Sequence, residues 1–522
     1  MKIELYDTTL RDGAQTEGVS YSVNDKINIA KKLDELGIQY IEGGWPGANP
    51  KDSDFFRKMK RIKLKNSQLV GFCSTRHPRK KIYLDQNIRG VLNAQTEIVT
   101  IFGKSWDLHV REVLKVSLED NLDLIRETIG YFKSKNKKVF YDAEHFFDGY
   151  KANPEYALKT ILVAQQAGAD TIVLCDTNGG SLPEEVYEII QNVKNKINIP
   201  LGIHSHNDLG LAVANSLVAI KAGCSHIQGT FNGLGERCGN ADLATLIGIL
   251  KLKLKIDCIS DVNLKRLTHI SHYIWEVSNL KPQDNQPFVG RSAFAHKGGV
   301  HIDAMLKNPK TYEHIEPTSV GNHRRFLVSE LSGKSSIVAI AKDIELSLDK
   351  KSSKAKKIFK LLQDLEHRGY QFEAAEGSFK LLLNKELKRF KKFFELEGFR
   401  VIVEKRPDER VFAEATIRLK VKGKEQYTAS EGSGPVNALD NALRKALIQF
   451  YPQLAKMHLS DFKVRVLDEK AGTAAKVRVL IQSQDEKESW GTVGVSENII
   501  EASWQALIDS IEYKLLKDKI NA

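Results

Sequence analysis

The sequence has few cysteines and no closely spaced pair of them. Its 522 residues include five cysteines, and none belongs to a Cys-x-x-Cys motif. An odd number of scattered cysteines argues against a disulfide framework and against a structural zinc site. This usage fits a reducing compartment, so the sequence predicts a cytoplasmic protein whose thiols are buried or half-buried.

The sequence also lacks long hydrophobic runs. No segment approaches the roughly 20 consecutive apolar residues that a helix needs to cross a bilayer. The N-terminus has no basic segment followed by an apolar one, as a secretory signal would have. With 42% hydrophobic and 28% charged residues, the composition is typical of a folded soluble protein, and no membrane partner is expected.

Aromatic residues are absent from most of the densest basic stretches. The formal net charge is +12, which can attract nucleic acid or acidic small molecules. The runs at 57–65 and 388–392 do not interleave aromatics with the cations, as proteins that bind single strands do. We therefore expect solvated lysine-rich helix faces and no nucleic-acid partner.

Eight short apolar runs alternate with amphipathic helical patterns in the first half of the chain. Eight strands alternating with helices over about 250 residues are typical of a parallel (β/α)8 TIM barrel. A doubly wound open sheet is the alternative, although it usually has fewer strands. The apolar runs lie at 3–7, 40–44, 70–74, 98–102, 139–144, 171–177, 201–206 and 226–231.

The chain is too long for one hydrophobic core, and its pattern changes twice. Residues 1–275 form the predicted barrel of this α/β protein. Residues 276–392 have the pattern of linker subdomains, strongly helical and lysine-rich from 336 onward. In residues 393–522 a strand, a Gly-containing turn and a helix follow one another twice. This repetition predicts an α+β domain made of a duplicated ββα module, in which each half covers the other.

Polar and ionisable residues follow several of the predicted strands at the same end. In a β/α barrel this end carries the catalytic groups. Chance explains one or two such cases, but several strands with the same arrangement indicate an active site. The residues are Arg11 and Asp12 after the first strand, Asp142 and Glu144 in the fifth, Thr177 at the end of the sixth, and His204 and His206 in the seventh.

His204 and His206 are two residues apart on a strand, so both side chains point to one face. Two imidazoles that converge suit a first-row divalent metal. Asp12 can add a carboxylate, because the first strand is adjacent to the eighth in a closed barrel. The alternative is that these histidines are hydrogen-bonded structural residues.

Long motifs resemble a known family of enzymes. The strings DTTLRDGAQ (7–15), HSHNDLGLAVANS (204–216) and GTFNGLGERCGNADL (229–243) are similar to those of acyl-CoA-condensing metalloenzymes, which include isopropylmalate, homocitrate and citramalate synthases. HKGGVHIDAML (296–306) resembles the linker of these synthases, and EGSGPVNALDNAL (431–443) resembles their C-terminal regulatory domain. The resemblance covers nearly the whole chain and implies a TIM-barrel transferase that uses acetyl-CoA.

The resemblance implies a role for each barrel residue. The metal would be held by Asp12, His204 and His206, with Asn240 as an additional or near ligand, and would chelate a 2-oxo acid. Arg11 would neutralise the developing alkoxide. Thr177 would hydrogen-bond the substrate carboxylate. Glu144 would take part in removing a proton from the acetyl methyl group, or orient the group that does, although an ordinary salt bridge is the alternative.

The resemblance also places two residues of the linker at the site. His301 and Tyr312 would complete it as catalytic residues from the neighbouring subunit of a homodimer. Tyr312 has a less distinctive sequence context, so an ordinary packed aromatic is the alternative. The metal stays open between Mn2+, Mg2+, Zn2+ and Co2+.

The identity of the 2-oxo acid depends on the segment EGGWPGANPKD (42–52). It resembles one branch of citramalate synthases, which use pyruvate, and Trp45 would narrow the pocket toward a methyl group. Asp142 stands where better-known members have an aromatic, so isopropylmalate synthesis, from 2-oxoisovalerate, stays open. Homocitrate synthesis is disfavoured because no additional Arg/His pair for a second carboxylate is visible. A lyase resembling only residues 1 to about 280 and a silent binding protein are the remaining alternatives.

The C-terminal module predicts feedback control. Gly432, Gly434 and Pro435 stand at the start of a predicted helix, where backbone N–H groups can receive a small anion such as an amino-acid carboxylate. If citramalate is the product, isoleucine is the expected inhibitor, and leucine is the alternative.

Overall fold

The computed structural model describes residues 2–327, 337–338, 341, 348–349, 352–405, 411–467, 472, 474–486 and 488–520. The chain forms two compact units. The first comprises Met1–Phe294 and Ile315–His323, and the second comprises Ala295–His314 and Arg324–Ala522.

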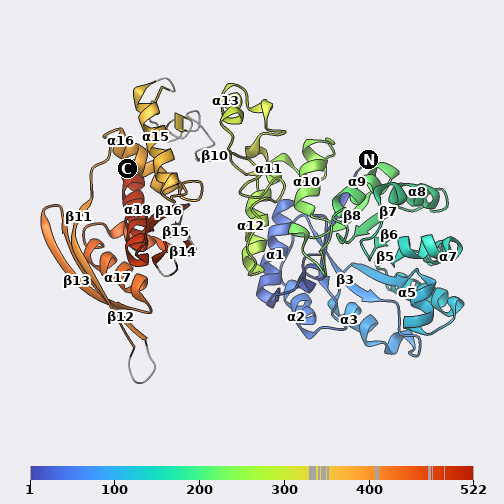
Figure 1. The fold of residues 1–522 in the computed structure, drawn as a ribbon. Helices are drawn as coiled ribbons and strands as arrows, with labels where there is room; N and C mark the ends of the chain where they lie inside the picture. The colour runs from blue at the N-terminus through green and yellow to red at the C-terminus, as the bar shows by residue number, and fades with distance from the viewer. Residues whose placement is uncertain are drawn as a thin grey trace. The chain divides into compact units, whose positions relative to one another are not determined.

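The first unit contains the predicted closed parallel barrel, whose strands β1 to β8 pair in chain order. Strand β8 closes the ring by pairing in parallel with β1, with Glu4 opposite His226. Figure 1 shows these strands inside a layer of helices. The strands are β1 (Glu4–Asp7), β2 (Tyr40–Gly44), β3 (Gln68–Ser74), β4 (Ile98–Lys104), β5 (Lys138–Glu144), β6 (Thr171–Asp176), β7 (Leu201–Ser205) and β8 (His226–Gly229).

The helices between these strands have clear sequence signals at their ends. Ser22 and Asp25 form a capping box at the start of α1, and Gly37 ends it in a left-handed conformation with φ 94°. The main helices are α1 (Val23–Leu36), α2 (Pro50–Met59), α3 (Gln86–Ala94), α5 (Leu118–Ser134), α7 (Pro154–Gln166), α8 (Pro183–Lys194), α9 (Ala212–Ala222), α10 (Leu243–Leu252) and α12 (Leu267–Val277). Short helices α4 (Asp107–His109), α6 (Phe146–Ala152) and α11 (Asp261–Leu264) lie in the connections.

The barrel interior is filled toward the N-terminal ends of its strands. A buried cluster there consists of Tyr6, Tyr40, Val70, Ile98 and Phe140. The ring of His226 contacts three of these aromatics, with its centroid 4.8 Å from that of Phe140. Because this layer is packed with side chains, polar residues that face the interior gather at the opposite, C-terminal end.

The second unit starts with short elements and then becomes helical. Strands β9 (Ala295–His296) and β10 (Arg325–Phe326) pair in parallel, and α13 (Gly299–Lys307) lies between them in the sequence. The helical pattern predicted for 336–392 includes α15 (Ser353–His367) and α16 (Glu376–Glu386). Other parts of that stretch, including 342–347, lie outside the described residues.

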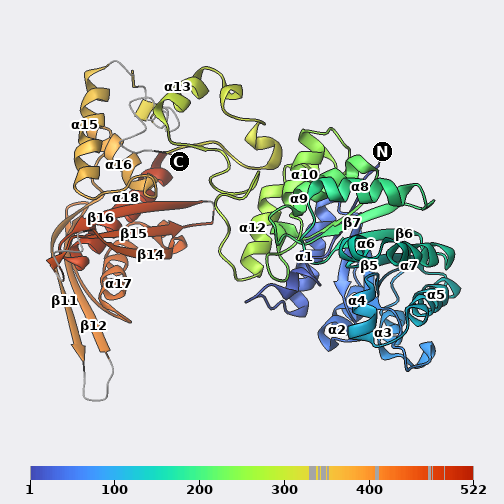
Figure 2. The same cartoon turned by 45° about the vertical axis from the view of Figure 1, so that its right-hand side comes forward.

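Two similar sheet-and-helix modules follow, as the duplication predicts, and each contains a third strand. The first has β11 (Phe394–Lys405), β12 (Val411–Val421), β13 (Lys424–Gly432) and α17 (Pro435–Leu447). The second has β14 (His458–Val466), β15 (Val477–Gln484), β16 (Ser489–Ser496) and α18 (Ile499–Ile520). Figure 2 shows both sheets, with α17 beside the lower one. No described helix is long and apolar enough to cross a membrane.

Candidate metal and substrate site

Asp12, His204 and His206 come together at the C-terminal end of the barrel. One ligand atom from each lies within 4.8 Å of the others, and all three residues are buried. Nε2 of His204 lies 3.1 Å from Oδ2 of Asp12. Among the described residues this is the one group of three or more acidic, His or Cys side chains close enough to hold a metal ion.

The closure of the barrel brings these three residues together. Asp12 lies in the turn after β1, where its backbone N–H donates to the carbonyl of Thr8 at 2.8 Å. His204 lies within β7, and His206 directly after it. The closed ring places β7 and β1 on either side of β8, so residues from both ends of the barrel sequence share one site.

Asn240 joins the same cluster. Its Nδ2 lies 3.2 Å from Oδ2 of Asp12 and 3.1 Å from Nε2 of His204. Its Oδ1 and Nδ1 of His206 are buried and find no hydrogen-bond partner among the described residues. Amide oxygen and nitrogen positions are interchangeable by a flip, which would turn Oδ1 toward the cluster. The set offers nitrogen and oxygen donors that suit a divalent metal.

Gln228 determines which nitrogen of His204 faces this cluster. Nε2 of Gln228 donates to Oδ1 of Asp142 at 3.0 Å, so its Oε1 is left to face Nδ1 of His204 at 2.9 Å. An amide oxygen only accepts, so Nδ1 of His204 carries a proton and donates it. In neutral His204 the lone pair is then on Nε2, the atom that faces Asp12 and Asn240.

The charges around the site are balanced by one arginine. Nε of Arg11 donates to Glu42, which is fully buried on β2, and Nη1 lies 3.4 Å from Oδ2 of Asp12. Burial alone would raise the pKa of Asp12, but Arg11 and the hydrogen bond with His204 hold that pKa well below its usual range. Asp12 therefore stays ionised and available as a ligand.

Burial shifts the pKa values of two neighbouring groups. Burial, together with the charge of Glu42, raises the pKa of Asp142 to about 7. Burial and the charge of His204 lower the pKa of His206 to about 3. His206 is therefore neutral at pH 7, the state in which an imidazole coordinates a metal.

Glu144 lies at the end of β5, and Thr177 directly follows the adjacent strand β6. Glu144 ends β5 and forms an ion pair with Nζ of Lys104 on β4. Oγ1 of Thr177 accepts the backbone N–H of His145 at 2.9 Å, so its own hydroxyl proton can be donated elsewhere.

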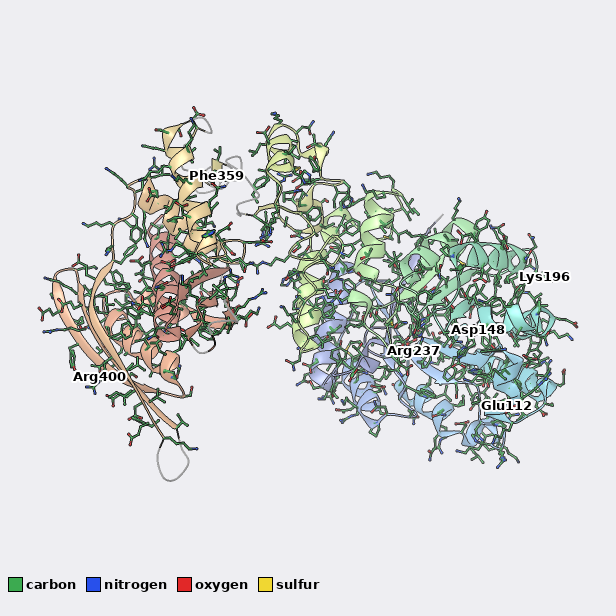
Figure 3. All side chains as sticks on the ribbon, in the orientation of Figure 1. Glu112, Asp148, Lys196, Arg237, Phe359 and Arg400 are labelled. Carbon is green, nitrogen blue, oxygen red and sulfur yellow. The ribbon has the colours of Figure 1, made fainter. Side chains whose placement is uncertain are left out.

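A bidentate ion pair connects the loops after β6, β7 and β8. Nε and Nη2 of Arg237 each lie 2.8 Å from an oxygen of Asp208, and Nη2 also donates to the carbonyl of Thr177 at 2.7 Å. Figure 3 labels Arg237 and Asp148 on this part of the barrel. The pair holds in place the loops that present His206, Thr177 and Asn240.

Aromatic rings form a wall beside Arg11. The guanidinium carbon of Arg11 lies 4.0 Å from the ring centre of Phe72 on β3. Phe72 stacks on Phe102 of β4 at 5.2 Å, and Trp45 meets Phe102 edge to face at 5.4 Å. These residues leave a site with cationic and aromatic sides next to the metal ligands.

The linker residues predicted for the site lie in the second unit. The rings of His301 and Tyr312 stack with their centres 4.2 Å apart. The next residue, Glu313, is buried and accepts from Nε2 of His296 at 3.1 Å and from Nε of Arg324 at 2.7 Å. This buried network holds the turn that carries Tyr312.

The predicted regulatory residues form the turn into α17. Gly432 ends β13, Gly434 is the N-cap of α17, and Pro435 is its first residue. A cavity of about 560 Å3 lies along the same helix, bounded by α17, β14 and α18. Asp440 is one of the lining residues; its Oδ2 accepts from Nε of Arg444 at 2.8 Å, and its buried Oδ1 finds no partner among the described residues.

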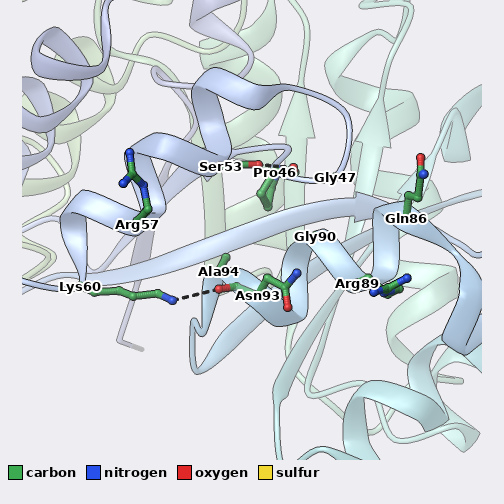
Figure 4. Close-up of a pocket in the computed structure, with 10 residues that line it drawn as sticks. All are labelled: Pro46, Gly47, Ser53, Arg57, Lys60, Gln86, Arg89, Gly90, Asn93 and Ala94. Carbon is green, nitrogen blue, oxygen red and sulfur yellow. Dashed lines mark hydrogen bonds between the residues drawn. The ribbon is translucent and has the colours of Figure 1, made fainter.

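Another groove, of about 530 Å3, lies between α2 and α3 (Figure 4). Two of its three cations are already engaged, because Arg57 pairs with Asp54 and Nζ of Lys60 donates to the carbonyl of Asn93 at 3.1 Å. None of the predicted site residues lines it.

Sequence patterns missed several groups that shape the site. Glu42 and Gln228 lie inside short strands, and Phe72 and Phe102 have the appearance of ordinary core residues. One signal was available for Glu42, an acidic residue within an apolar run. Arg237 belongs to the motif at 229–243, but the sequence did not indicate a role for it.

Models of three families match successive parts of the chain. The HMGL-like model matches residues 2–274, the homocitrate synthase post-HMGL domain-like model matches 288–369, and the LeuA allosteric (dimerisation) domain model matches 373–515.

Curated relatives match nearly the whole chain. The (R)-citramalate synthases of Geobacter sulfurreducens and Aquifex aeolicus are each 55% identical over 99% of this chain and 98% of their own length. The 2-isopropylmalate synthase of Methanocaldococcus jannaschii is 30% identical over 99% of this chain and 95% of its own.

Proposed function

Because the chain belongs to the (R)-citramalate synthases of the HMGL-like family, we propose that it condenses acetyl-CoA with pyruvate and releases (R)-citramalate and free CoA. The identity of 55% over 99% of the chain to curated (R)-citramalate synthases carries this proposal. The enzyme is an acyltransferase that converts the acyl group into an alkyl group on transfer. Synthesis of isopropylmalate or homocitrate is the less favoured alternative.

The metal site consists of Asp12, His204 and His206, with Asn240 as the fourth protein group. A divalent metal bound there would act as a Lewis acid toward the keto and carboxylate oxygens of pyruvate. Histidine ligands suit Mn2+, Zn2+ or Co2+, and Mg2+ serves where substrate oxygens fill much of the shell.

Arg11 and Thr177 bind the 2-oxo acid. The guanidinium of Arg11 is held at the site by Glu42, so it meets the alkoxide that develops on the keto oxygen without reorganising. Thr177 donates its hydroxyl proton to the substrate carboxylate, because the backbone N–H of His145 already occupies a lone pair of its oxygen.

Glu144 removes a proton from the acetyl methyl group. Its ion pair with Lys104 fixes its direction at the end of β5. His301 and Tyr312 assist from the linker of the partner subunit, where their stacked rings are held by the turn that contains Glu313.

The aromatic wall favours pyruvate over larger 2-oxo acids. Trp45, Phe72 and Phe102 pack against one another next to Arg11, and their bulk disfavours a long substrate side chain. A methylene in such a pocket changes the transition-state free energy by about 1–3 kcal/mol.

A substrate panel tests the function. CoA release is measured with pyruvate, 2-oxoisovalerate and 2-oxoglutarate at the same metal concentration. We expect kcat/KM to be highest with pyruvate. A higher value with either of the other two acids would overturn the assignment.

The C-terminal module regulates the enzyme, with isoleucine as the inhibitor. The cavity along α17 combines apolar side chains, among them Val436 and Leu459, with the ion pair of Asp440 and Arg444. An aliphatic side chain matches the first feature, and the ammonium and carboxylate groups of an amino acid match the second. Activity that is unchanged by added isoleucine would refute this proposal. Inhibition by leucine alone would identify leucine as the inhibitor.

The enzyme acts as a homodimer in which residues 1–275 catalyse, 276–392 connect and 393–522 regulate. The match of residues 373–515 to an allosteric dimerisation domain supports this division. Light scattering should give a mass twice that of the 58.7 kDa chain.

A further inference from the structure

His145 has an unusual backbone conformation at the end of β5. Its φ is 55°, in the left-handed region that non-glycine residues seldom adopt, and the residue is buried. Such conformations persist where the surroundings hold them, and they are concentrated at functional sites. Here the backbone N–H of His145 is held by Oγ1 of Thr177.

An acidic residue orients the imidazole. Nδ1 of His145 lies 3.4 Å from Oδ2 of Asp148, and the same oxygen accepts Nδ2 of Asn178 at 3.1 Å. The carboxylate favours the tautomer with the proton on Nδ1. In the neutral imidazole the lone pair is then on Nε2, and Asp148 orients the ring as a third group does in other activated pairs.

A second histidine packs against the first. The ring of His109 lies with its centre 4.2 Å from that of His145, and Trp106 stacks on His109 at 5.4 Å. Burial lowers the pKa of His109. His109 is therefore a neutral packing partner that does not add a charge beside His145.

This cluster lies next to the reacting groups. Thr177, which accepts from His145, directly follows Asp176, and the carbonyl of Asp176 accepts the backbone N–H of His206 at 3.1 Å. Glu144 immediately precedes His145 in the chain. The backbone of His145 is thus connected to that of a metal-ligating residue, His206, through Thr177 and Asp176.

The proposed reaction requires two deprotonations. Glu144 takes the proton of the acetyl methyl group and passes it to the alkoxide that forms on the former keto oxygen, so activation of water is left to a second base. We propose that His145, oriented by Asp148, is the base that takes a proton from water when the citramalyl thioester is hydrolysed. This inference rests on the proposed function.

The step is balanced with water as the only further reactant. Nε2 of His145 accepts a proton as the water oxygen bonds to the thioester carbonyl carbon. The tetrahedral intermediate then breaks its carbon–sulfur bond, and the CoA thiolate leaves and takes up the proton from His145. The products are citramalate and CoA.

Two variants test the role without straining the backbone. His145→Asn keeps a side chain that tolerates the left-handed region, and His145→Gly leaves a space for added imidazole. Both are mixed with pyruvate and acetyl-CoA, quenched in acid at successive times, and analysed for citramalyl-CoA by mass spectrometry. We expect the thioester to accumulate while its hydrolysis slows by about 10²–10⁴-fold. Imidazole should restore hydrolysis in His145→Gly.

His109→Phe is the matched control, because it keeps the ring packing and removes the second imidazole. It should show no more thioester than the unmodified enzyme. Absence of citramalyl-CoA in both His145 variants, or an equal fall of condensation and hydrolysis that imidazole does not reverse, overturns the inference. If the unmodified enzyme makes no citramalate from pyruvate, the proposed function fails instead.

Discussion

Gln228 connects two buried ionisable groups through its two different ends. Its amide nitrogen faces Asp142 and its oxygen faces His204. With Asp142 ionised, reversing the amide would place an oxygen against a carboxylate, so the orientation with the NH2 group toward Asp142 is the stable one. One glutamine therefore fixes the tautomer of a metal ligand.

Replacing this glutamine should weaken metal binding. In Gln228→Leu, His204 loses the acceptor that orients its ring, and loss of such a partner typically lowers metal affinity by about 10–100-fold. Calorimetric titration of the metal-free protein with Mn2+ measures the effect. Gln39→Leu is the matched control, because Gln39 bonds to backbone carbonyls of Gly37 and Cys258 away from the site. Equal Kd values for the two variants would contradict the prediction.

Enlarging the aromatic wall should change substrate choice. In Trp45→Ala, the ring that meets Phe72 and Phe102 is removed, and a longer 2-oxo acid side chain gains room. We expect the ratio of kcat/KM for 2-oxobutanoate to that for pyruvate to rise by about 10-fold or more, which corresponds to about 1–3 kcal/mol per methylene. Trp106→Ala, in the loop after β4, serves as the comparison, and an identical ratio in both variants would count against Trp45.

The metal-ligand set could be predicted because its signal is local. The alternation of His204 and His206 on one strand and the position of Asp12 after another are visible in short strings. Glu42 and Gln228 could not be assigned in this way. Their roles depend on which strands face each other across the barrel interior, and an amide or carboxylate within a short strand does not reveal its partner.

At the scale of elements, the turn between β13 and α17 depends on one of its two glycines. A Cβ on Gly432 would lie 2.3 Å from the backbone nitrogen of Ala438, whereas a Cβ on Gly434 would meet nothing within 4 Å. Gly434 has an extended conformation with φ −169° that any residue can adopt. The close approach of helix and strand therefore requires a glycine at position 432 but not at position 434.

Replacing each glycine with alanine should have different effects at the two positions. Gly432→Ala forces α17 away from β13, and overpacking of this kind costs about 1–3 kcal/mol. We expect a lower Tm for the C-terminal unit and weaker inhibition by isoleucine. Gly434→Ala should behave like the unmodified chain. Thermal unfolding by calorimetry measures both, and equal Tm values would show that the turn can relax.

Strands of the barrel were easier to predict than strands of the C-terminal sheets. The eight barrel strands are buried apolar runs, and each is found within two or three residues of its predicted bounds. Strands β11 and β14 are mostly exposed, so no alternation of buried and exposed residues marks them. Their pairing with β12 and β15 is what makes them strands.

At the scale of the whole molecule, two units with separate cores predict two unfolding transitions. The metal ligands all belong to the first unit, so a metal stabilises that unit alone. At a concentration of about 100 times its Kd, a ligand adds about 2.7 kcal/mol. In calorimetry, replacing EDTA with excess Mn2+ should raise the Tm of the first unit and leave the Tm of the second unit unchanged. A shift of both transitions together would show that the units unfold as one.

The closure of the barrel by β1 and β8 also determines when the metal site can form during synthesis of the chain. Asp12 and Asn240 are 228 residues apart in the sequence, yet they share one site. A chain emerging from the ribosome at about 5–20 residues per second has made its first strand long before the partner strand exists. The N-terminal segment must therefore wait, unpaired along one edge, for at least ten seconds or so of synthesis. During that interval the nascent chain exposes a strand that chaperones can recognise, and it can neither retain metal nor begin turnover.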